Sequence, residues 1–375
     1  MTIDYGNLKI IYHHPRQLKD DGKSGSEVRP YEMLQAFKRL GVEVFEVTGK
    51  LRDRRAKMRG LKSRLERGEV FDFVYCENLT IPYAMSELHR LPLNPLIDHR
   101  FLSFCSSRGI PVSLFNRDVH WRDSSYRQML PWWGRMVTIP LYWFDWIWHI
   151  KYLDMLYLPS EAMAKTLPWI EKFKQVRYLP PGSKIFTAGP EIRSKSDLRV
   201  FYVGGIEPPY YDLAPLFLAV KRSKRRISLT ICCREKEWNR VKSYYEPYLN
   251  QNITIVHRSG AALEPMYKES DLFAVVRSMG SYIDLSVPIK IYESIGFALP
   301  VLCTPGGETE RIVREEQIGW VKSEENIAEF LDFLAGRPDL LLKRNNAIRQ
   351  IQTRHTWEAR AAQVCNEMVG TKANA

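Results

Sequence analysis

The sequence has few cysteines and no long uncharged apolar run. Its six cysteines are scattered, apart from the adjacent Cys232 and Cys233. Neighbouring residues on a strand point to opposite faces of a sheet, so this pair is poorly placed to chelate one metal ion. We expect buried free thiols, as in a reducing cytoplasm. No segment reads as a membrane-spanning helix and residues 1–9 lack an apolar run, so we expect neither a span nor a secretion signal.

Acidic residues are in deficit. The chain carries 55 lysines and arginines against 43 aspartates and glutamates, which gives a formal net charge of +12. This excess favours an anionic partner, and nucleic acid, anionic lipid and phosphorylated substrates all qualify. The basic residues do not interleave with a recognised nucleic-acid motif, so no nucleic acid is expected among the partners. A basic nucleic-acid-binding protein stays open as an alternative function.

The composition is that of a globular protein, and a length of 375 residues predicts two domains. Strand-like apolar runs, among them residues 8–13 and 272–276, alternate in both halves with predicted helices, among them residues 80–107. This alternation indicates an α/β fold with two Rossmann-like domains facing a central cleft. The predicted boundaries are a first domain over 1–184, a linker over 185–197, a second domain over 198–355, and a closing helix and tail over 356–375.

The most informative stretch covers residues 287–313 and begins as a short helix. Pro288 suits the first turn of a helix, because its missing N–H costs nothing there. A helix over 289–297 would place Lys290 and Glu293, three residues apart, on one face. A carboxylate can accept hydrogen bonds from ribose hydroxyls and an ammonium can meet phosphate, so this pair suits a nucleotide sugar.

The same stretch continues as a strand and a second helix. Residues 300–304 predict a short apolar strand, Gly306 and Gly307 a tight turn, and Glu310 lies at the start of the next helix. Free amides at such a helix start can hold anionic oxygens. The alternative interpretation is an ordinary strand–helix junction of an α/β domain.

These residues resemble the donor-binding block of GT-B fold glycosyltransferases of the bacterial glycan-assembly type. That family often carries Lys-x-x-Glu, Gly-x-Pro-Val, a Gly-Gly turn and a Glu, and the matching residues here are Lys290, Glu293, Pro300-Val301, Gly306-Gly307 and Glu310. The family's glycine normally lies two residues before the proline, where this chain has Ala298, and the nearby glycine is Gly296. The resemblance implies an acceptor-binding first domain and a nucleotide-sugar-binding second domain. It also implies that Glu293 holds the ribose and that Lys290 stabilises the departing diphosphate.

The second half opens on a glycine turn of its own. Gly204 and Gly205 follow a predicted strand, and glycines let the backbone approach a phosphate. Many relatives place an arginine and a lysine just after this turn, whereas this chain continues with residues 206–209, IEPP. Lys290 or Arg234 would then supply the positive charge for the diphosphate.

A predicted strand over 110–115 delivers Asp118 and His120 at its carboxyl end. Ligands of open parallel sheets bind beyond such ends, and GT-B enzymes resembling this chain often place an Asp or His there. Asp118 is the preferred candidate for the base that deprotonates the acceptor hydroxyl, and His120 is the second. A helix cap for Asp118 and a surface or core position for His120 are the structural alternatives.

Two stretches of the first half point to a membrane surface. Residues 51–68 predict a helix with many lysines and arginines against only Asp53 and Glu66, and residues 121–151 are rich in tryptophan and tyrosine. A solvated helix and aromatic packing in the core are the ordinary interpretations. Basic helices also bind anionic lipid, and Trp and Tyr favour the membrane–water boundary, so we lean to a peripheral membrane surface.

The favoured function is a nucleotide-sugar-dependent glycosyltransferase that acts on a glycan or lipid-linked glycan in surface polysaccharide assembly. We expect it in the cytoplasm or on the inner face of the cytoplasmic membrane. The chain has no Asp-x-Asp pair, so no metal is expected, nor any cofactor besides the nucleotide-sugar substrate. Retaining relatives often carry two acidic residues eight apart, but Leu285 lies eight before Glu293, which slightly favours inversion. A sugar-nucleotide epimerase or hydrolase of the same fold is the alternative enzyme.

Overall fold

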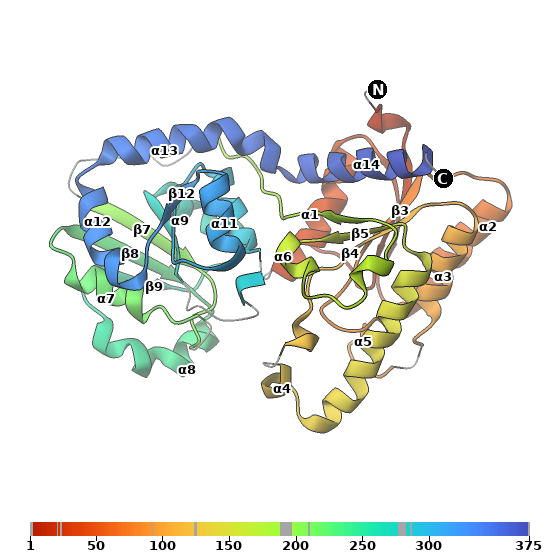
Figure 1. Ribbon diagram of the computed structural model, residues 1–375, viewed down its shortest axis with the longest axis horizontal. Coiled ribbons are helices and arrows are strands. Elements are labelled where there is room, and N and C mark those ends of the chain that lie inside the picture. Colours follow the sequence, from red (N-terminus) through yellow and green to blue (C-terminus); the bar gives the residue numbers. More distant parts are fainter. Residues whose placement is uncertain are drawn as a thin grey trace. The chain divides into compact units, whose positions relative to one another are not determined.

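The computed structural model describes residues 3–20, 22, 25–92, 94–123, 126–187, 197–208, 211–276, 283–285 and 287–373 (Figure 1). The chain divides into two compact units. The first is Met1–Pro180 with Trp357–Ala375, and the second is Pro181–Thr356. The predicted boundaries at 184, 198 and 355 stay a prediction, and residues 188–196 of the predicted linker lie outside the described residues.

The first unit contains a six-stranded parallel sheet in the order β2-β1-β3-β4-β5-β6. Its strands are β1 Lys9–His14, β2 Glu43–Thr48, β3 Phe73–Glu77, β4 Val112–Phe115, β5 Met155–Leu158 and β6 Val176–Tyr178. In β1, Ile10 and Ile11 are both fully buried, as in strands covered by helices on both faces. The strand order reverses between β1 and β3, and ligands of α/β sheets bind beyond the carboxyl ends of strands at such a switch point.

Helices cover both faces of this sheet (Figure 1). They are α1 Gly25–Arg39, α2 Leu51–Glu66, α3 Ile97–Ser107, α4 Tyr126–Met129, α5 Trp132–Tyr152, α6 Glu161–Ala164 and α14 Trp357–Ala373. Helix α1 packs against α14 and α3 against α5. Right-handed crossovers place α2, α3 and α5 together on the other face from α1.

Helices were predicted through residues 80–107, and this prediction is wrong for most of the stretch. Apart from one short 3-10 turn at Tyr83–Met85, regular helix begins only with α3. Pro82, Pro92 and Pro95 interrupt the segment, because proline lacks the amide that a helix interior needs. The resulting loop lies beyond the carboxyl end of β3, where it can line a site.

The second unit contains another six-stranded parallel sheet, in the order β12-β11-β10-β7-β8-β9. Its strands are β7 Asp197–Val203, β8 Arg226–Cys232, β9 Ile253–Val256, β10 Leu272–Val275, β11 Val301–Cys303 and β12 Gly319–Val321. The order reverses between β7 and β10. Strand β12 was not predicted, because three residues are too few to show a period.

The helices of the second unit complete two apolar clusters, one that includes Leu229 and one that includes Phe201. These helices are α7 Ala214–Arg222, α8 Glu235–Tyr245, α9 Glu264–Lys268, α10 Ile289–Gly296, α11 Gly307–Glu315, α12 Ile327–Ala335 and α13 Pro338–Ile351. Helix α8 was not predicted, although Glu235 and Glu237 in its first turn favour a helix start there.

The predicted α/β class with two Rossmann-like domains is confirmed. All six cysteines are buried and free, as expected from the sequence. No helix in the described ranges combines the length and apolar character needed to cross a membrane.

Candidate active site

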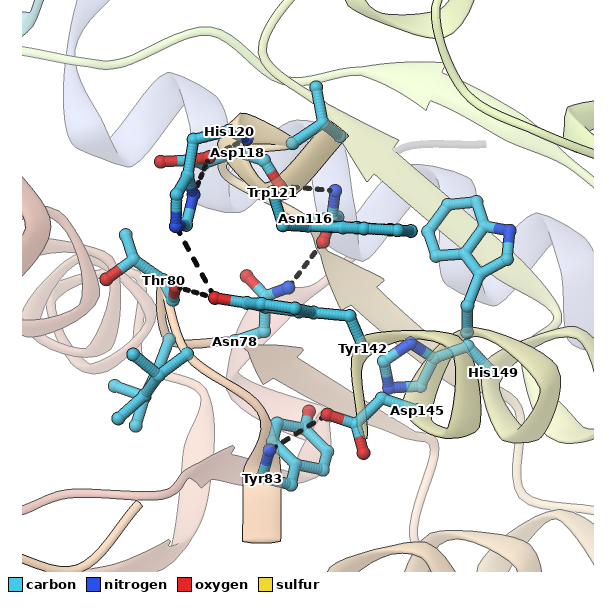
Figure 2. A pocket seen from close by; sticks show the side chains of 14 residues that line it. Asn78, Thr80, Tyr83, Asn116, Asp118, His120, Trp121, Tyr142, Asp145 and His149 are labelled. Carbon is cyan, nitrogen blue, oxygen red and sulfur yellow. Dashed lines mark hydrogen bonds and ion pairs between the residues drawn. The ribbon is translucent and has the colours of Figure 1, made fainter. Parts of the chain in front are cut away.

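The carboxyl end of β4 brings Asp118 and His120 together (Figure 2). Asp118 Oδ1 accepts a hydrogen bond from the backbone N–H of His120 at 2.7 Å and lies 2.5 Å from His120 Nδ1. Asn116 Nδ2 donates to the Asp118 carbonyl at 3.3 Å and so steadies the same turn. The side chains of Asp118 and His120 are 20% and 15% exposed, so a substrate can reach them.

The other ring nitrogen of His120 faces Tyr142 on α5. Nε2 lies 3.4 Å from Tyr142 Oη, which donates its proton to the Thr80 carbonyl at 2.6 Å (Figure 2). Burial raises the pKa of Tyr142 well above its usual range, so the phenol keeps that proton. With Nδ1–H donating to the carboxylate, the neutral imidazole has its lone pair on Nε2. A carboxylate that orients an imidazole in this way is a common support for a general base.

The cavity beside this pair is small. Its volume is about 30 Å³, and its walls include Asn78, Thr80, Asp118, His120, Tyr142 and Asp145. Such a volume suits one or two water molecules and is too small for a sugar ring.

The second half of α5 packs inside the first unit. Trp146 is 4% exposed, and its Nε1 donates to the Pro168 carbonyl at 2.9 Å. Asp145 accepts from the backbone N–H of Tyr83 and lies 2.8 Å from His99 Nε2. Burial raises the pKa of Asp145. Core packing, the ordinary interpretation of the tryptophan-rich stretch, is therefore correct for this half.

The first half of α5 is exposed. Trp132, Trp133 and Met136 are 68%, 63% and 69% exposed, and Met129 and Val137 beside them are also exposed. These five residues are called the apolar tip below. Within the tryptophan-rich stretch, the predicted membrane interface can therefore concern only the apolar tip. Membrane contact itself stays a prediction.

Helix α2 presents a basic face, with one exception. Arg54 is fully buried, where its guanidinium pairs with Asp98 at 3.1 Å and donates to the carbonyl of Gly49. Burial raises the pKa of Asp98, but the contact with His13 at 2.8 Å and, after it, the pairing with Arg54 lower the pKa overall to about 2. The sequence counts Arg54 among the cations of the predicted basic helix, but its side chain is not part of the exposed face, because the buried carboxylate of Asp98 on α3 needs a partner.

The donor block of the second unit forms a compact polar cluster. Lys290 Nζ donates to both carboxylate oxygens of Glu293, at 3.1 and 2.8 Å. Tyr267 on α9 donates its hydroxyl to Glu293 Oε2 at 2.8 Å. Burial raises the pKa of Tyr267 well above its usual range, so it remains a donor. The side chains of Lys290 and Glu293 are 29% and 24% exposed, and hence reachable from solvent.

The end of α10 explains the displaced glycine of the motif. Ala298 adopts a left-handed φ of 54°, the conformation that favours glycine, at the position where relatives carry one. Gly296 is needed for another reason, because a Cβ there would lie 2.2 Å from the Lys184 carbonyl oxygen. Pro288 lies just outside the helix as its N-cap rather than in its first turn.

Gly306, Gly307 and Glu310 form the predicted turn into α11, and most of their polar groups already have partners. Gly306 has a φ of 117°, and its N–H donates to Glu310 Oε2 at 2.8 Å. Glu310 also accepts from Arg314 at 2.7 Å, and the two bonds lower its pKa. A donor role for Gly306 and Glu310 stays a prediction that would require an exchange of these partners.

Gly204 and Gly205 form the predicted turn after β7, and Arg234 caps α8. The Gly204 N–H donates to the Cys232 carbonyl at 3.1 Å, which continues the sheet. Arg234 is 67% exposed and pairs with Glu237. The structure thus brings together Lys290 and Glu293, while Arg234 lies on a different element with a partner of its own.

Tyr267 was missed by the sequence analysis. It lies 26 residues before Glu293, and its ring stacks on Phe297 with centroids 4.6 Å apart. Packing between α9 and the end of α10 creates this contact, and no spacing in the sequence signals it.

Comparison with known proteins supports the resemblance seen in the donor block. Residues 197–335 match the family Glycosyl transferases group 1. No curated protein matches the chain.

Several solved structures have a similar fold. Sucrose-phosphate synthase of Thermosynechococcus elongatus is 14% identical with a TM-score of 0.63, and the match covers 98% of this chain and all of that one. A glycosyltransferase of Rickettsia africae is 12% identical with a TM-score of 0.65, over 98% and 99% of the chains. Anabaena HepE, solved with UDP and glucose, is 12% identical with a TM-score of 0.59, over 97% and 100%.

At these identities the structural likeness establishes the fold, and the family match concerns the second unit. The chain therefore has the GT-B fold, and residues 197–335 of its second unit are similar to the group 1 glycosyl transferases.

Proposed function

We propose that this protein transfers a sugar from a nucleotide-sugar donor to a glycan or lipid-linked glycan acceptor, in the assembly of a surface polysaccharide. The observation that carries the proposal is the cluster of Lys290, Glu293 and Tyr267, which lies inside the domain that matches the group 1 transferases.

The cluster suits a ribose next to a diphosphate. Tyr267 donates to one carboxylate oxygen of Glu293 and fixes its orientation, so the carboxylate can accept from vicinal ribose hydroxyls. Lys290 is a mobile ammonium at the rim of the cluster, and it would turn from Glu293 to the phosphates when a nucleotide binds. HepE was solved with UDP, so uridine nucleotides are the first donors to test.

The first unit would supply the base for the acceptor hydroxyl. Sequence analysis preferred Asp118, but both its contacts with His120 favour a dyad in which His120 Nε2 takes the proton. Asp118 then holds the imidazole in the right tautomer and stabilises its protonated form. The 30 Å³ cavity is too small for the acceptor sugar, so the acceptor would approach His120 from outside it.

Two finer features also belong to this proposal. We propose that the sugar is transferred with inversion, and that Lys290 rather than a metal ion offsets the charge of the leaving diphosphate. The anomeric configuration of the product, read by NMR, tests the first. Activity that survives EDTA and is unchanged by added Mg²⁺ or Mn²⁺ tests the second.

A membrane location is the third part of the proposal. We propose peripheral binding to the inner face of the cytoplasmic membrane, where lipid-linked acceptors are exposed. The apolar tip, at the end of α4 and the start of α5, and the exposed cations Arg52, Arg55 and Arg59 of α2 support it, and α2 and α5 lie on the same face of the sheet.

Binding of nucleotides tests the donor site directly. A thermal-shift screen of nucleoside diphosphates and nucleotide sugars identifies the ligand, and calorimetry then measures its affinity for three variants. Glu293→Gln and Lys290→Ala should each weaken binding by roughly 1.5–3 kcal/mol, the worth of a hydrogen bond to a charged group. Glu315→Gln, an exposed carboxylate on α11, is the matched control. Equal affinity in all variants would show that the donor binds elsewhere.

A further inference from the structure

A second cavity lies at the switch point of the first sheet, and nothing above assigns it a role. Its volume is about 360 Å³. Its walls come from the end of β1 and the segment after it, the start of α1, the loop after β3 and the segment after β4. They include His14, Arg16, Lys19, Glu27, Arg90 and Arg117. This is the place where an open α/β sheet binds its ligand.

The cavity is strongly cationic. Arg16, Lys19, Arg90 and Arg117 line it, and Glu27 is the acidic residue among its described walls. In the part of the chain that the structure describes, no carboxylate lies within ion-pairing distance of Arg16, Lys19 or Arg90. Burial lowers the pKa of Arg16, and the neighbouring charge of Arg90 adds to the effect, with Glu27 and Glu87 opposing it. Four cations thus line the cavity, and its described walls contain a single carboxylate, that of Glu27.

Two buried polar side chains of the cavity have unused hydrogen-bonding groups. His14 is 3% exposed, and its Nε2 has no hydrogen-bond partner among the described residues. Arg117 donates from Nη1 to the Ser26 carbonyl at 2.8 Å, its Nη2 lies 3.7 Å from Glu77, and its Nε makes no hydrogen bond among the described residues. A buried group without a partner is costly, so a ligand that met these nitrogens would be favoured.

The buried charges behind the wall do not cancel. Glu77 is fully buried between Arg29, at 3.3 Å, and Arg117, at 3.7 Å. Arg29 also stacks on the ring of Phe115 at 3.4 Å. The single negative charge of Glu77 therefore lies between the two positive charges of Arg29 and Arg117. This leaves an excess positive charge at the floor of the cavity.

The cavity adjoins the candidate base. Its walls share Leu79, Thr80 and Ile81 with the small cavity beside His120, and Arg117 directly precedes Asp118 in the chain. One molecule could therefore place an anionic group among the arginines and a hydroxyl near His120.

We propose that this cavity binds a phosphate group of the acceptor, so that the acceptor is a phosphorylated molecule. A tetrahedral dianion can accept hydrogen bonds from the guanidinium groups that line the cavity and from the start of α1, which contributes Ser26 and Glu27 to its wall. The inference rests on the proposed transferase function, since it identifies the class of molecule that brings the hydroxyl.

Calorimetric titration with inorganic phosphate tests the site, at constant ionic strength and in a Lys290→Ala background that removes the ammonium proposed to contact the phosphates of the donor. Arg16→Gln/Arg90→Gln should weaken binding at least about tenfold, as expected for lost hydrogen bonds to a charged group. Arg67→Gln/Arg108→Gln makes the same charge change on exposed residues outside the cavity and should not. Undiminished binding in the first variant, or an equal loss in the second, would overturn the proposal.

A second arm separates this inference from the donor proposal. With Lys290 intact, Arg16→Gln/Arg90→Gln should bind UDP as the parent does, and a parallel loss of UDP affinity would assign the cavity to the donor and overturn the inference. If UDP binds no variant, the proposed function is in question while the phosphate result stands.

A third arm identifies the source of the phosphate. Glucose 6-phosphate represents soluble sugar phosphates and farnesyl phosphate represents lipid-linked ones. Binding of either that requires Arg16 and Arg90 supports the site and names its class, and binding of neither overturns it. NMR shifts of the His14 ring on phosphate addition provide a readout that does not depend on a variant's stability.

Discussion

At the residue scale, the contact between Asp118 and His120 makes a kinetic prediction. His120→Ala should lower turnover about 10²–10⁴-fold, because the acceptor hydroxyl loses its base. Asp118→Asn should also lower turnover, since an amide cannot stabilise the imidazolium, while the KM for the donor changes little in both. Steady-state kinetics with His89→Gln, an exposed histidine, as control would measure this. Loss of activity in Asp118→Asn alone would make Asp118 the base.

His14 makes a second prediction, on the pH dependence of stability. Burial lowers its pKa from 6.5 to about 3, with Arg117, His13 and Arg16 adding to the shift. Between pH 6.5 and about pH 3, His14 therefore binds a proton in the unfolded chain but not in the native protein. The free energy of unfolding should therefore fall as the pH drops from 6.5 towards 3, and the contribution of His14 is complete only above 6.5.

Urea unfolding between about pH 7 and pH 4 measures this dependence. His14→Gln should show a shallower slope than the parent, and His89→Gln an unchanged one. An identical slope for the parent and His14→Gln would contradict the burial of a neutral His14.

At the scale of elements, the end of α10 predicts opposite tolerances for two neighbouring small residues. Gly296→Ala forces a Cβ against the Lys184 carbonyl and should lower the free energy of unfolding by about 1–3 kcal/mol. Ala298→Gly relieves a left-handed φ, which should stabilise the fold by about 1 kcal/mol. It also loses a buried methyl group, which should cost about 0.8 kcal/mol, so the free energy of unfolding should change little. Urea unfolding compares the two, and a tolerated Gly296→Ala would contradict the close contact.

Most strands could be predicted because parallel strands buried on both faces read as short apolar runs. Residues 8–13 and 272–276 became β1 and β10 with shifts of one residue. Residues 80–96 are not regular helix, because Pro82, Pro92 and Pro95 interrupt the pattern, and the mainly charged and polar sequence of α8 shows little apolar periodicity. The pattern of apolar residues predicts an element only where successive or regularly spaced residues of that element are buried.

The candidate site could be predicted in part for the same reason. Lys290 and Glu293 share a helix face, so their contact follows from spacing alone. The contacts of Tyr267 and Arg54 depend on packing between distant elements, and the sequence gives no hint of them. Nor could spacing show that the Glu310 carboxylate bonds the Gly306 amide.

At the scale of the whole molecule, the apolar tip and the α2 cations predict binding to anionic vesicles. Each cation near such a surface is worth about 1 kcal/mol, and salt weakens the attraction. Arg52→Gln/Arg55→Gln/Arg59→Gln and Trp132→Ser/Trp133→Ser should each reduce sedimentation with these vesicles. Arg54 is left unchanged because it is buried.

The matched control for the charge variant is Arg222→Gln/Lys236→Gln/Lys343→Gln, which removes three exposed cations from the second unit. It should sediment as the parent does. Equal, weak binding to neutral and anionic vesicles at low salt would contradict the membrane proposal and leave a soluble acceptor.

The central claim is sugar transfer from a nucleotide sugar, and the most direct measurement is release of the nucleoside diphosphate, with and without acceptor. The donor found in the binding screen would be incubated with glycan or lipid-linked acceptors, and products identified by mass spectrometry. We predict release that depends on acceptor, a product heavier by one sugar, and loss of both in Glu293→Gln. Acceptor-independent hydrolysis or an isomerised donor would contradict the claim and identify the epimerase or hydrolase alternative.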